Sequence, residues 1–374
     1  MDKQKYGRTY QLVSADDHVQ EPEDTWQSRV PSKLKGRAPK IVHTANGDAW
    51  EIDGKVGATF GLGAQAGRKF EEYKPAGESY ASIRKGSYEP GERLKDMDLD
   101  GVDAQVLFPN LAIAEFYNMK DQELQVACLR AYNDFLADFC ATDPARLLGV
   151  ALLPTDDVGA AVAEVGRVAK LRELRGVMVP TYPRLKPLDN SIYDPIWAAA
   201  QDADLPVHIH LITGSKAERF NELNSAGLLC AEMANHSLAC YETLAKVIFT
   251  GVLERFPRLK FVSVEGNIGW IGYFLEKMDR TYKRHRHWTR LELPMLPSEY
   301  FHRQVYATFI EDPIGVKIAE AIGADNLMWS SDYPHTDTTW PNSRQYVEET
   351  FKGVSEATKR KIVAGNAVRL YGLN

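Results

Sequence analysis

Strand-like and helix-like segments alternate along most of this chain, and this alternation restricts the fold more than any other feature. Apolar strands without polar alternation belong to parallel sheets that are covered on both faces. After a first strand that leads into Asp16, such strands are predicted at 103–109, 147–153, 176–180, 205–210, 259–265, 304–308 and 326–330. Eight strand–helix units predict an α/β fold, the (β/α)8 or TIM barrel.

Amphipathic stretches between these strands predict the helices of the barrel. They fall at 90–99, 121–142, 156–171, 193–202, 228–255, 270–284 and 313–322, and a helical C-terminal tail follows at 343–373. An open doubly wound sheet is the alternative architecture, but it would carry a glycine-rich phosphate-binding turn after its first strand. This chain has Asp16-Asp17-His18 there. We therefore expect residues 1–374 to form one barrel domain.

A long polar stretch at about 30–88 interrupts the alternation after the first strand. It contains Asn46-Gly47 between two β-type runs, which is a hairpin signal. Its glycine-rich part at 57–67 lacks the spacing of a phosphate loop and predicts a mobile loop. We expect this insertion to cover one end of the barrel.

Composition narrows the classes of protein that remain. The net charge is -6 without a basic stripe, which argues against a nucleic-acid partner. No apolar run is long enough to span a membrane, and the polar N-terminal segment has no apolar signal core, so we expect a cytoplasmic protein. The cysteines lie in helix-like segments without CxxC spacing, which predicts free, packed thiols. They are Cys128, Cys140, Cys230 and Cys240.

Acidic residues and histidines follow the ends of four predicted strands, where TIM-barrel active sites lie. Asp16 and His18 share one face of the first strand because side chains alternate along a strand. Carboxylate and imidazole ligands in this mixture suit Zn, Fe or Mn. The candidate metal ligands are Asp16, His18, Glu21, His210, Glu265, Asp332 and His335.

Each candidate also has a purely structural interpretation. Only one of His208 and His210 need be a ligand, and we prefer His210 because it lies nearer the end of the strand. Glu265 could pair with a neighbouring cation, although a carboxylate after an apolar strand is costly unless it is paired. Asp332 could cap a helix, and His335 could be an ordinary loop residue. Four polar strand ends together favour a site.

The sequence resembles the amidohydrolase superfamily, in the branch related to aminocarboxymuconate-semialdehyde decarboxylase. The resemblance covers nearly the whole chain and implies a divalent metal held by Asp16, His18, His210 and Asp332. The motifs that carry it are Asp16-Asp17-His18, Leu205-Pro-Val-His-Ile-His210, Phe256-Pro-Arg-Leu-Lys-Phe-Val262, Trp329-Ser-Ser-Asp332-Tyr-Pro-His335 and Gly365-Asn-Ala-Val-Arg-Leu-Tyr-Gly372.

The chain departs from this branch at two places. The branch often opens with His-x-His or Glu-x-His, whereas this chain has Asp-x-His at 16–18. Its decarboxylases commonly have a histidine followed by glycines at the end of the sixth strand, and that histidine assists proton transfer. This chain has Glu265-Gly266-Asn267 there. The departure weakens the transfer of the decarboxylase mechanism.

The resemblance implies an enzyme that acts on a small, carboxylated organic molecule by hydrolysis or by non-oxidative decarboxylation. A single metal ion would activate water or hold an arene acid while it loses carbon dioxide. The candidate catalytic residues are Asp332, Glu265 and His335. Arg84 and Trp270 are candidate substrate contacts, Arg84 because a guanidinium binds carboxylates bidentately.

Two other functions stay open. Seven potential ligands exceed the needs of one ion and suit two ions bridged by carboxylates. The chain is also similar to a smaller group in the superfamily that binds two iron or manganese ions and activates oxygen to hydroxylate carbon. A third interpretation is a catalytically silent subunit whose metal stabilises the barrel.

The resemblance also implies a homo-oligomer, or a hetero-oligomer with a related subunit. Three segments are candidate contacts with such a partner. They are the helix that begins at Trp270 and the connections around 212–227 and 285–300.

Overall fold

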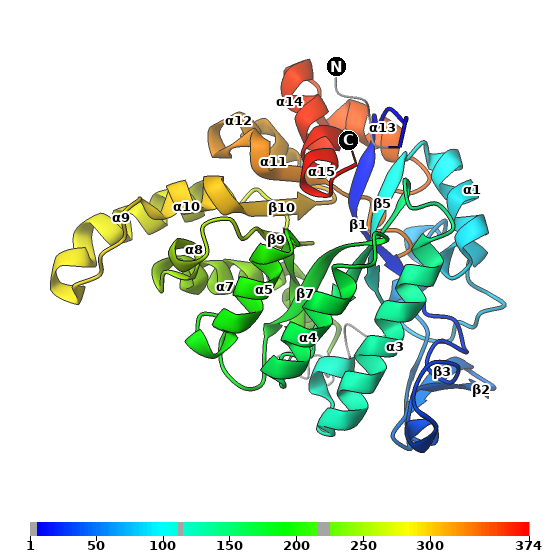
Figure 1. Ribbon diagram of the computed structural model, residues 1–374. Helices are drawn as coiled ribbons and strands as arrows, with labels where there is room; N and C mark the ends of the chain where they lie inside the picture. The colour runs from blue at the N-terminus through cyan, green and yellow to red at the C-terminus, as the bar shows by residue number, and fades with distance from the viewer. Residues whose placement is uncertain (1–5, 111–114, 215–224, 374) are drawn as a thin grey trace.

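Eight parallel strands form a nearly closed barrel, which confirms the predicted fold class (Figure 1). The computed structural model describes residues 6–110, 115–214 and 225–373, so most of the predicted contact at 212–227 lies outside the described residues. In ring order the strands are β1 (Val13–Val19), β5 (Ala104–Pro109), β6 (Leu147–Leu152), β7 (Leu174–Tyr182), β8 (Val207–Gly214), β9 (Phe261–Val264), β10 (Val305–Phe309) and β11 (Leu327–Trp329).

Backbone hydrogen bonds bring the first strand against the segment that follows the last one. The Asp332 N–H donates to the Asp16 carbonyl at 3.0 Å, and the His18 N–H donates to the Tyr333 carbonyl at 2.7 Å. These bonds close the ring on the side where β1 and β11 meet. Two segments at opposite ends of the sequence, both with candidate ligands, therefore lie side by side.

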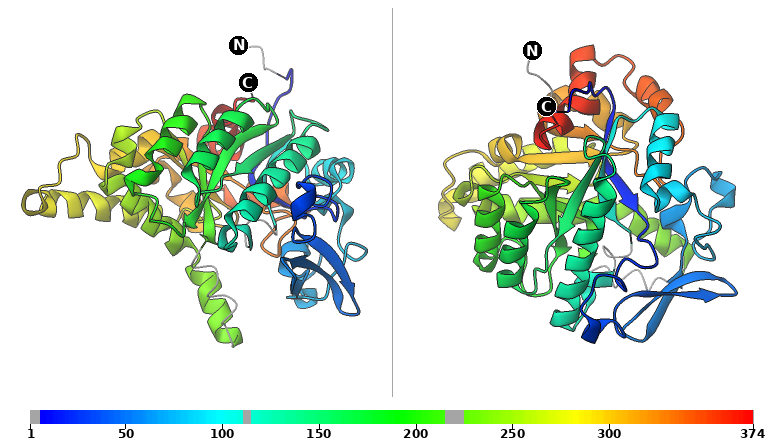
Figure 2. Two further views of the ribbon diagram at one scale, coloured as in Figure 1. Left: turned by 60° about the horizontal axis from the view of Figure 1, so that its bottom comes forward. Right: turned by 45° about the vertical axis from the view of Figure 1, so that its right-hand side comes forward.

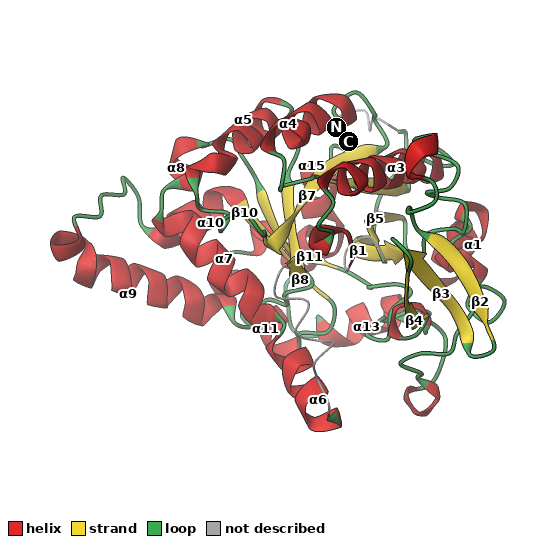
Figure 3. Ribbon diagram, turned by 90° about the horizontal axis from the view of Figure 1, so that it is seen from below, coloured by secondary structure: helices red, strands yellow, loops and turns green. Residues whose placement is uncertain are grey.

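Helices cover the outside of the barrel (Figures 1 and 3). Those between the strands largely follow the predicted order, and the predicted helical tail is present. The α-helices are α1 (Pro90–Asp100), α3 (Gln122–Cys140), α4 (Val158–Val168), α5 (Asp194–Asp202), α6 (Ala226–Asn235), α7 (Ser237–Phe249), α8 (Val252–Arg255), α9 (Ile271–Thr289), α10 (Pro297–Gln304), α11 (Pro313–Lys317), α12 (Ala319–Ile322), α13 (Ser343–Thr350), α14 (Glu356–Arg360) and α15 (Asn366–Leu370).

Three segments differ from the sequence-based expectation. The helical stretch predicted at 228–255 is divided into α6, α7 and α8, and Gly251 separates the last two with a φ of 77°. α9 continues to Thr289, beyond the predicted end, and its residues after Tyr282 are all exposed. α10 was not predicted; Pro297 occupies its first turn, and the Glu299 carboxylate accepts from the Leu296 N–H at 2.6 Å.

The insertion after β1 contains the predicted hairpin and one further strand. β2 (Lys40–Thr44) and β3 (Gly47–Ile52) pair antiparallel through a short turn, and β4 (Lys55–Thr59) adds to β3. β4 occupies the beginning of the stretch that was predicted as a mobile loop. Figure 2 shows this small sheet beside the barrel, next to α3.

The insertion also contacts the segment after β11. The backbone N–H groups of Gln65 and Ala66 both donate to the Pro334 carbonyl, at 2.9 and 3.0 Å, and the Tyr73 hydroxyl donates to the Thr336 carbonyl at 2.7 Å. The insertion therefore packs against the loop that carries two of the candidate ligands.

The structure also bears on what the sequence predicts for the cysteines and for membrane-spanning segments. All four cysteines are free, as predicted, and three are buried, but Cys230 on α6 is exposed. None of the residues of α6 is buried, because the helix extends away from the barrel (Figure 3). Within the described ranges, the helices lack the length and apolar character needed to cross a bilayer.

Replacing Trp26 with alanine should lower the free energy of unfolding by about 3–5 kcal/mol, as expected for a buried tryptophan. Trp26 is fully buried, its Nε1 donates to the Cys128 carbonyl at 3.1 Å, and its ring meets Trp50 and Phe116 edge-on. Urea denaturation followed by circular dichroism measures the change. The control Phe70→Ala, at an 82% exposed side chain, should change it by about 0.5 kcal/mol or less. An unchanged midpoint for Trp26→Ala contradicts this packing.

Candidate metal centre

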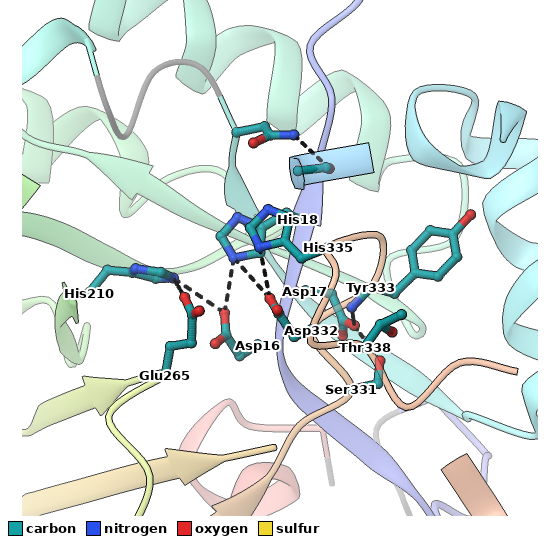
Figure 4. Close-up of polar contacts among 12 residues, drawn as sticks. Asp16, Asp17, His18, His210, Glu265, Ser331, Asp332, Tyr333, His335 and Thr338 are labelled. Carbon is teal, nitrogen blue, oxygen red and sulfur yellow. Dashed lines mark hydrogen bonds and ion pairs between the residues drawn. The ribbon is translucent and has the colours of Figure 1, made fainter. Parts of the chain in front are cut away.

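Six of the seven candidate ligands lie together at the C-terminal ends of the strands (Figure 4). Among the described residues, their potential ligand atoms form two groups, in each of which the atoms lie within 4.8 Å of one another. Both groups contain His18. The first group adds Asp16, His210 and Glu265, and the second adds Asp332 and His335.

The ligand atoms are spaced as they would be around a small cation. Asp16 Oδ1 lies 3.6 Å from His18 Nε2 and 3.6 Å from His210 Nε2. His18 Nε2 lies 3.4 Å from Asp332 Oδ1, and His210 Nε2 lies 3.2 Å from Glu265 Oε2. Bonds of roughly 2.0–2.2 Å to a metal place neighbouring ligand atoms roughly 3 Å apart. Small shifts therefore suffice to bind an ion.

Buried polar atoms without a hydrogen-bond partner test whether a cation fits. Among the described residues these atoms include both carboxylate oxygens of Asp16 and of Asp332, Nε2 of His18 and of His335, and both ring nitrogens of His210. A buried polar group that is left unpaired destabilises a protein. A divalent cation would satisfy several of these atoms at once, and the mixture of nitrogen and oxygen donors suits Mn, Fe or Zn.

The two histidines of β8 have different surroundings. His208 is fully buried, with Nδ1 3.0 Å from the Val177 carbonyl and Nε2 2.9 Å from the Tyr371 hydroxyl. Its ring nitrogens are thus occupied within the core. His210, two residues nearer the strand end, reaches the ligand cluster. This arrangement agrees with the preference for His210 over His208.

His18 is oriented by a contact on the far side of its ring. Its Nδ1 lies 2.8 Å from the Pro109 carbonyl at the end of β5. A carbonyl can only accept, so Nδ1 carries the hydrogen and Nε2 presents its lone pair to the cluster. Metal-binding histidines are commonly held in this way by their second nitrogen.

Burial shifts the proton affinities of the cluster. It raises the pKa of Asp16 and Asp332 above the usual range for aspartate, and the pKa of Glu265 to about 8. It lowers the pKa of His335 to about 3. For His210 burial also lowers the pKa, but Asp16 and Glu265 outweigh it and the pKa is raised. A bound divalent cation would favour the ionised carboxylates and lower their pKa values.

Solvent exposure divides the cluster into an inner and an outer part. The side chains of Asp16, His18 and Asp332 are at most 1% exposed, whereas those of Glu265 and His335 are 15% and 19% exposed. The His335 ring stacks on the His18 ring at a centroid distance of 3.9 Å. A substrate would therefore meet Glu265 and His335 first.

Glu21 and Arg84 lie elsewhere. Glu21 is fully buried but belongs to neither ligand group, and its Oε1 accepts from the Asn110 N–H at 3.2 Å. Arg84 forms an ion pair with Asp96 through two nitrogens, and its guanidinium lies 4.2 Å from the ring centroid of Trp340. The Nε and Nη2 groups of Arg84 are thus engaged with Asp96, and a role for Arg84 in substrate binding stays a prediction.

Trp270 lies in the connection between β9 and α9, as Glu265 does. Its Nε1 donates to the Gly266 carbonyl at 2.7 Å, and its ring packs against Tyr241 and Phe274. These contacts hold the connection between β9 and α9. A role for Trp270 in substrate binding stays a prediction.

The sequence reasoning missed two buried charged residues next to the cluster. Arg93 of α1 is fully buried; its Nη2 donates to the His18 carbonyl, and its Nε donates to the Gly86 carbonyl at 2.6 Å. The second residue is Asp17. Its position between two candidate ligands was visible, but its partners lie more than 300 residues away, so no local pattern indicated them.

Comparisons with known proteins agree with this geometry. The model of the amidohydrolase family matches residues 84–373, so the chain belongs to this family, in the branch related to the aminocarboxymuconate-semialdehyde and γ-resorcylate decarboxylases. A γ-resorcylate decarboxylase from Polaromonas sp. is 27% identical over 297 residues, which cover 75% of this chain and 87% of the relative.

Two solved structures share the fold. An amidohydrolase from Mycobacterium avium subsp. paratuberculosis has a TM-score of 0.76 and 22% identity, over 98% of this chain and all of the other. A dihydroxybenzoic acid decarboxylase from Polaromonas sp., solved with bound manganese and the inhibitor 2-nitroresorcinol, has a TM-score of 0.67 and 20% identity over 98% of both chains. At these identities the likeness shows the fold alone.

Replacing Asp332 with alanine should remove most of the bound divalent metal, because both of its buried oxygens face the cluster without another partner. The loss should exceed the roughly 10–100-fold weakening that follows loss of a supporting residue. Elemental analysis of protein purified without chelator measures it. The control Asp325→Ala removes a 61% exposed side chain that pairs with Lys361 and should keep the metal. Full retention in Asp332→Ala contradicts its assignment as a ligand.

Proposed function

We propose that the protein is a metal-dependent, non-oxidative decarboxylase of a small aromatic or similarly conjugated carboxylate. The observation that carries this proposal is the buried cluster of carboxylates and imidazoles, with Glu265 and His335 at its exposed edge. The six curated relatives that match are all decarboxylases, which supports this reaction over the hydrolysis that the motifs also predicted.

Decarboxylation of an aryl carboxylate needs one proton and no oxidant. The proton is added to the ring carbon that bears the carboxylate, the bond between the two carbons breaks, and its electron pair returns to the ring as carbon dioxide leaves. When bound, a divalent cation supplies Lewis-acid charge that polarises an oxygen of the substrate. The residues of the chain must then orient the carboxylate and deliver the proton.

We assign the proton transfer to Glu265. β9 ends at Val264, and Glu265 follows with a left-handed φ of 60°, held by a bond from its N–H to Thr308 Oγ1 at 2.8 Å. This conformation directs the carboxyl group toward His210, 3.2 Å away, while its side chain stays 15% exposed. Glu265 occupies the strand end at which decarboxylases of this branch commonly have a histidine.

The manganese-loaded protein should release carbon dioxide from a carboxylated phenol without consuming oxygen. 2,6-Dihydroxybenzoate and 5-carboxyvanillate are suitable probes, because solved relatives act on these compounds. Glu265→Gln should lower kcat by about 10²–10⁴-fold, the usual contribution of a positioned acid or base, and should keep the metal.

Glu311→Gln is the control for this experiment, because Glu311 is exposed and belongs to neither ligand group. Undiminished turnover in Glu265→Gln contradicts the proton-transfer role. Tight metal binding without carbon dioxide from either probe favours the catalytically silent subunit.

A dinuclear non-haem iron or manganese oxygenase is the second candidate. The specific observation in its favour is that the ligand atoms form two groups that share His18. Glu265 belongs to one group and His335 to the other, so each could complete the coordination of a separate ion. Two-metal sites commonly use carboxylates between ions that lie roughly 3.5–4 Å apart.

Metal stoichiometry distinguishes the two candidates. A decarboxylase should retain about one ion per chain and should turn over without oxygen. A dinuclear oxygenase should retain about two iron or manganese ions and should need oxygen, and His335→Ala should lower the stoichiometry to about one. His302→Ala is the control, because His302 is an exposed histidine outside both groups. If the parent and His335→Ala both bind about one ion per chain, the dinuclear oxygenase is excluded.

A further inference from the structure

Asp17 lies between two candidate ligands on β1 but faces away from them. Side chains alternate along a strand, so Asp16 and His18 point toward the metal centre and Asp17 points to the opposite face. Figure 4 shows Asp17 beside Ser331 and Tyr333, apart from the histidines. Asp17 is nevertheless fully buried. A buried carboxylate is costly unless other groups satisfy it, so its contacts need an explanation.

Asp17 contacts the residues on both sides of a candidate ligand that belongs to another segment. Its Oδ1 accepts a hydrogen bond from Ser331 Oγ at 2.5 Å and another from the Tyr333 N–H at 3.0 Å. These are the residues directly before and after Asp332. One carboxylate oxygen on β1 thus holds both neighbours of a ligand that is far away in sequence.

Asp332 needs such support because its backbone is strained. Its φ is 54°, in the left-handed region that residues other than glycine seldom adopt. A residue in a sparsely populated conformation costs on the order of 1–3 kcal/mol and persists only where its surroundings enforce it. Bonds from Asp17 on both sides enforce this conformation, and with it the direction of the Asp332 side chain.

We propose that Asp17 is a positioning residue of the metal centre. It fixes residues 331–333 against β1, so that Asp332 faces the same cation as Asp16 and His18. The inference rests on the metal centre of the proposed function, but not on the reaction that this centre performs.

Arg93 supports the same arrangement. Its guanidinium lies 4.4 Å from the ring centroid of Tyr333, and its Nη2 donates to the His18 carbonyl. The Tyr333 hydroxyl donates to Asp96 Oδ2 at 2.5 Å. A buried guanidinium therefore contacts both segments that Asp17 joins. Apolar packing alone would not need these directed bonds between charged groups and backbone atoms.

The affinity for Mn²⁺, measured by titration with electron paramagnetic resonance, tests the inference. Asp17→Ala should weaken Mn²⁺ binding roughly 10–100-fold, as loss of groups that orient metal ligands does. Asp17→Asn should stay within a few-fold of the parent, because asparagine keeps the Oδ1 acceptor and the atom it replaces, Oδ2, has no hydrogen-bond partner among the described residues.

Asp100→Ala is a matched control. Asp100 is also a buried aspartate that accepts from a backbone N–H and a serine hydroxyl, both of Ser343, at 2.8 and 2.5 Å. Its loss should lower the melting temperature without weakening Mn²⁺ binding. If Asp17→Ala is destabilised in the same way and binds Mn²⁺ as tightly as the parent, Asp17 is merely structural and the inference is overturned.

A milder variant covers the possibility that Asp17→Ala does not fold. Ser331→Ala removes one of the two donors and should weaken Mn²⁺ binding several-fold; parental affinity in this variant overturns the inference. A parent that binds no Mn²⁺ overturns the metal centre and this inference together. A parent that binds Mn²⁺ but releases no carbon dioxide overturns only the proposed reaction, and weak binding in the variants then still supports the role of Asp17.

Discussion

The closure between β1 and the segment after β11 is the constraint on which the candidate site depends. Two of the inner ligands come from β1 and a third, Asp332, follows β11. The backbone hydrogen bonds between these segments fix the register in which Asp332 lies beside Asp16. A shift of one residue along either segment would turn the side chains to the opposite face. The candidate metal centre therefore requires the barrel to close in one register.

The barrel and much of the cluster could be predicted because their signals are local. Each strand end has its own polar residue after an apolar run, and the barrel rule places these ends together without knowledge of any contact. Glu21 shows the limit of this reasoning. Its proximity in sequence to His18 suggested a ligand, but the chain turns after β1 and its carboxylate reaches the Asn110 N–H instead. The sequence likewise did not indicate the partner of Arg84, because only the tertiary structure brings Arg84 to Asp96.

The roles of Asp17 and Arg93 could not be predicted for a further reason. Both residues bind backbone groups, which every residue possesses, so the sequence contains no complementary signal for these contacts. The Asp17 carboxylate holds the N–H of Tyr333, and the Arg93 guanidinium holds the carbonyl of His18. Such residues stabilise a ligand geometry through the main chain, and burial is the first observation that distinguishes them from surface charges.

The two candidate functions make opposite demands on Glu265. A carboxyl group that delivers a proton must be protonated before the reaction, whereas a carboxylate that coordinates a cation must be ionised. Burial favours the protonated form, and a neighbouring cation favours the ionised one. With one ion held by the inner ligands, Glu265 remains at the exposed edge and is free to exchange its proton with substrate and solvent. With a second ion nearby, it would become a ligand and would lose its proton. In both candidate functions, the number of ions would therefore decide the role of Glu265, and with it the reaction class.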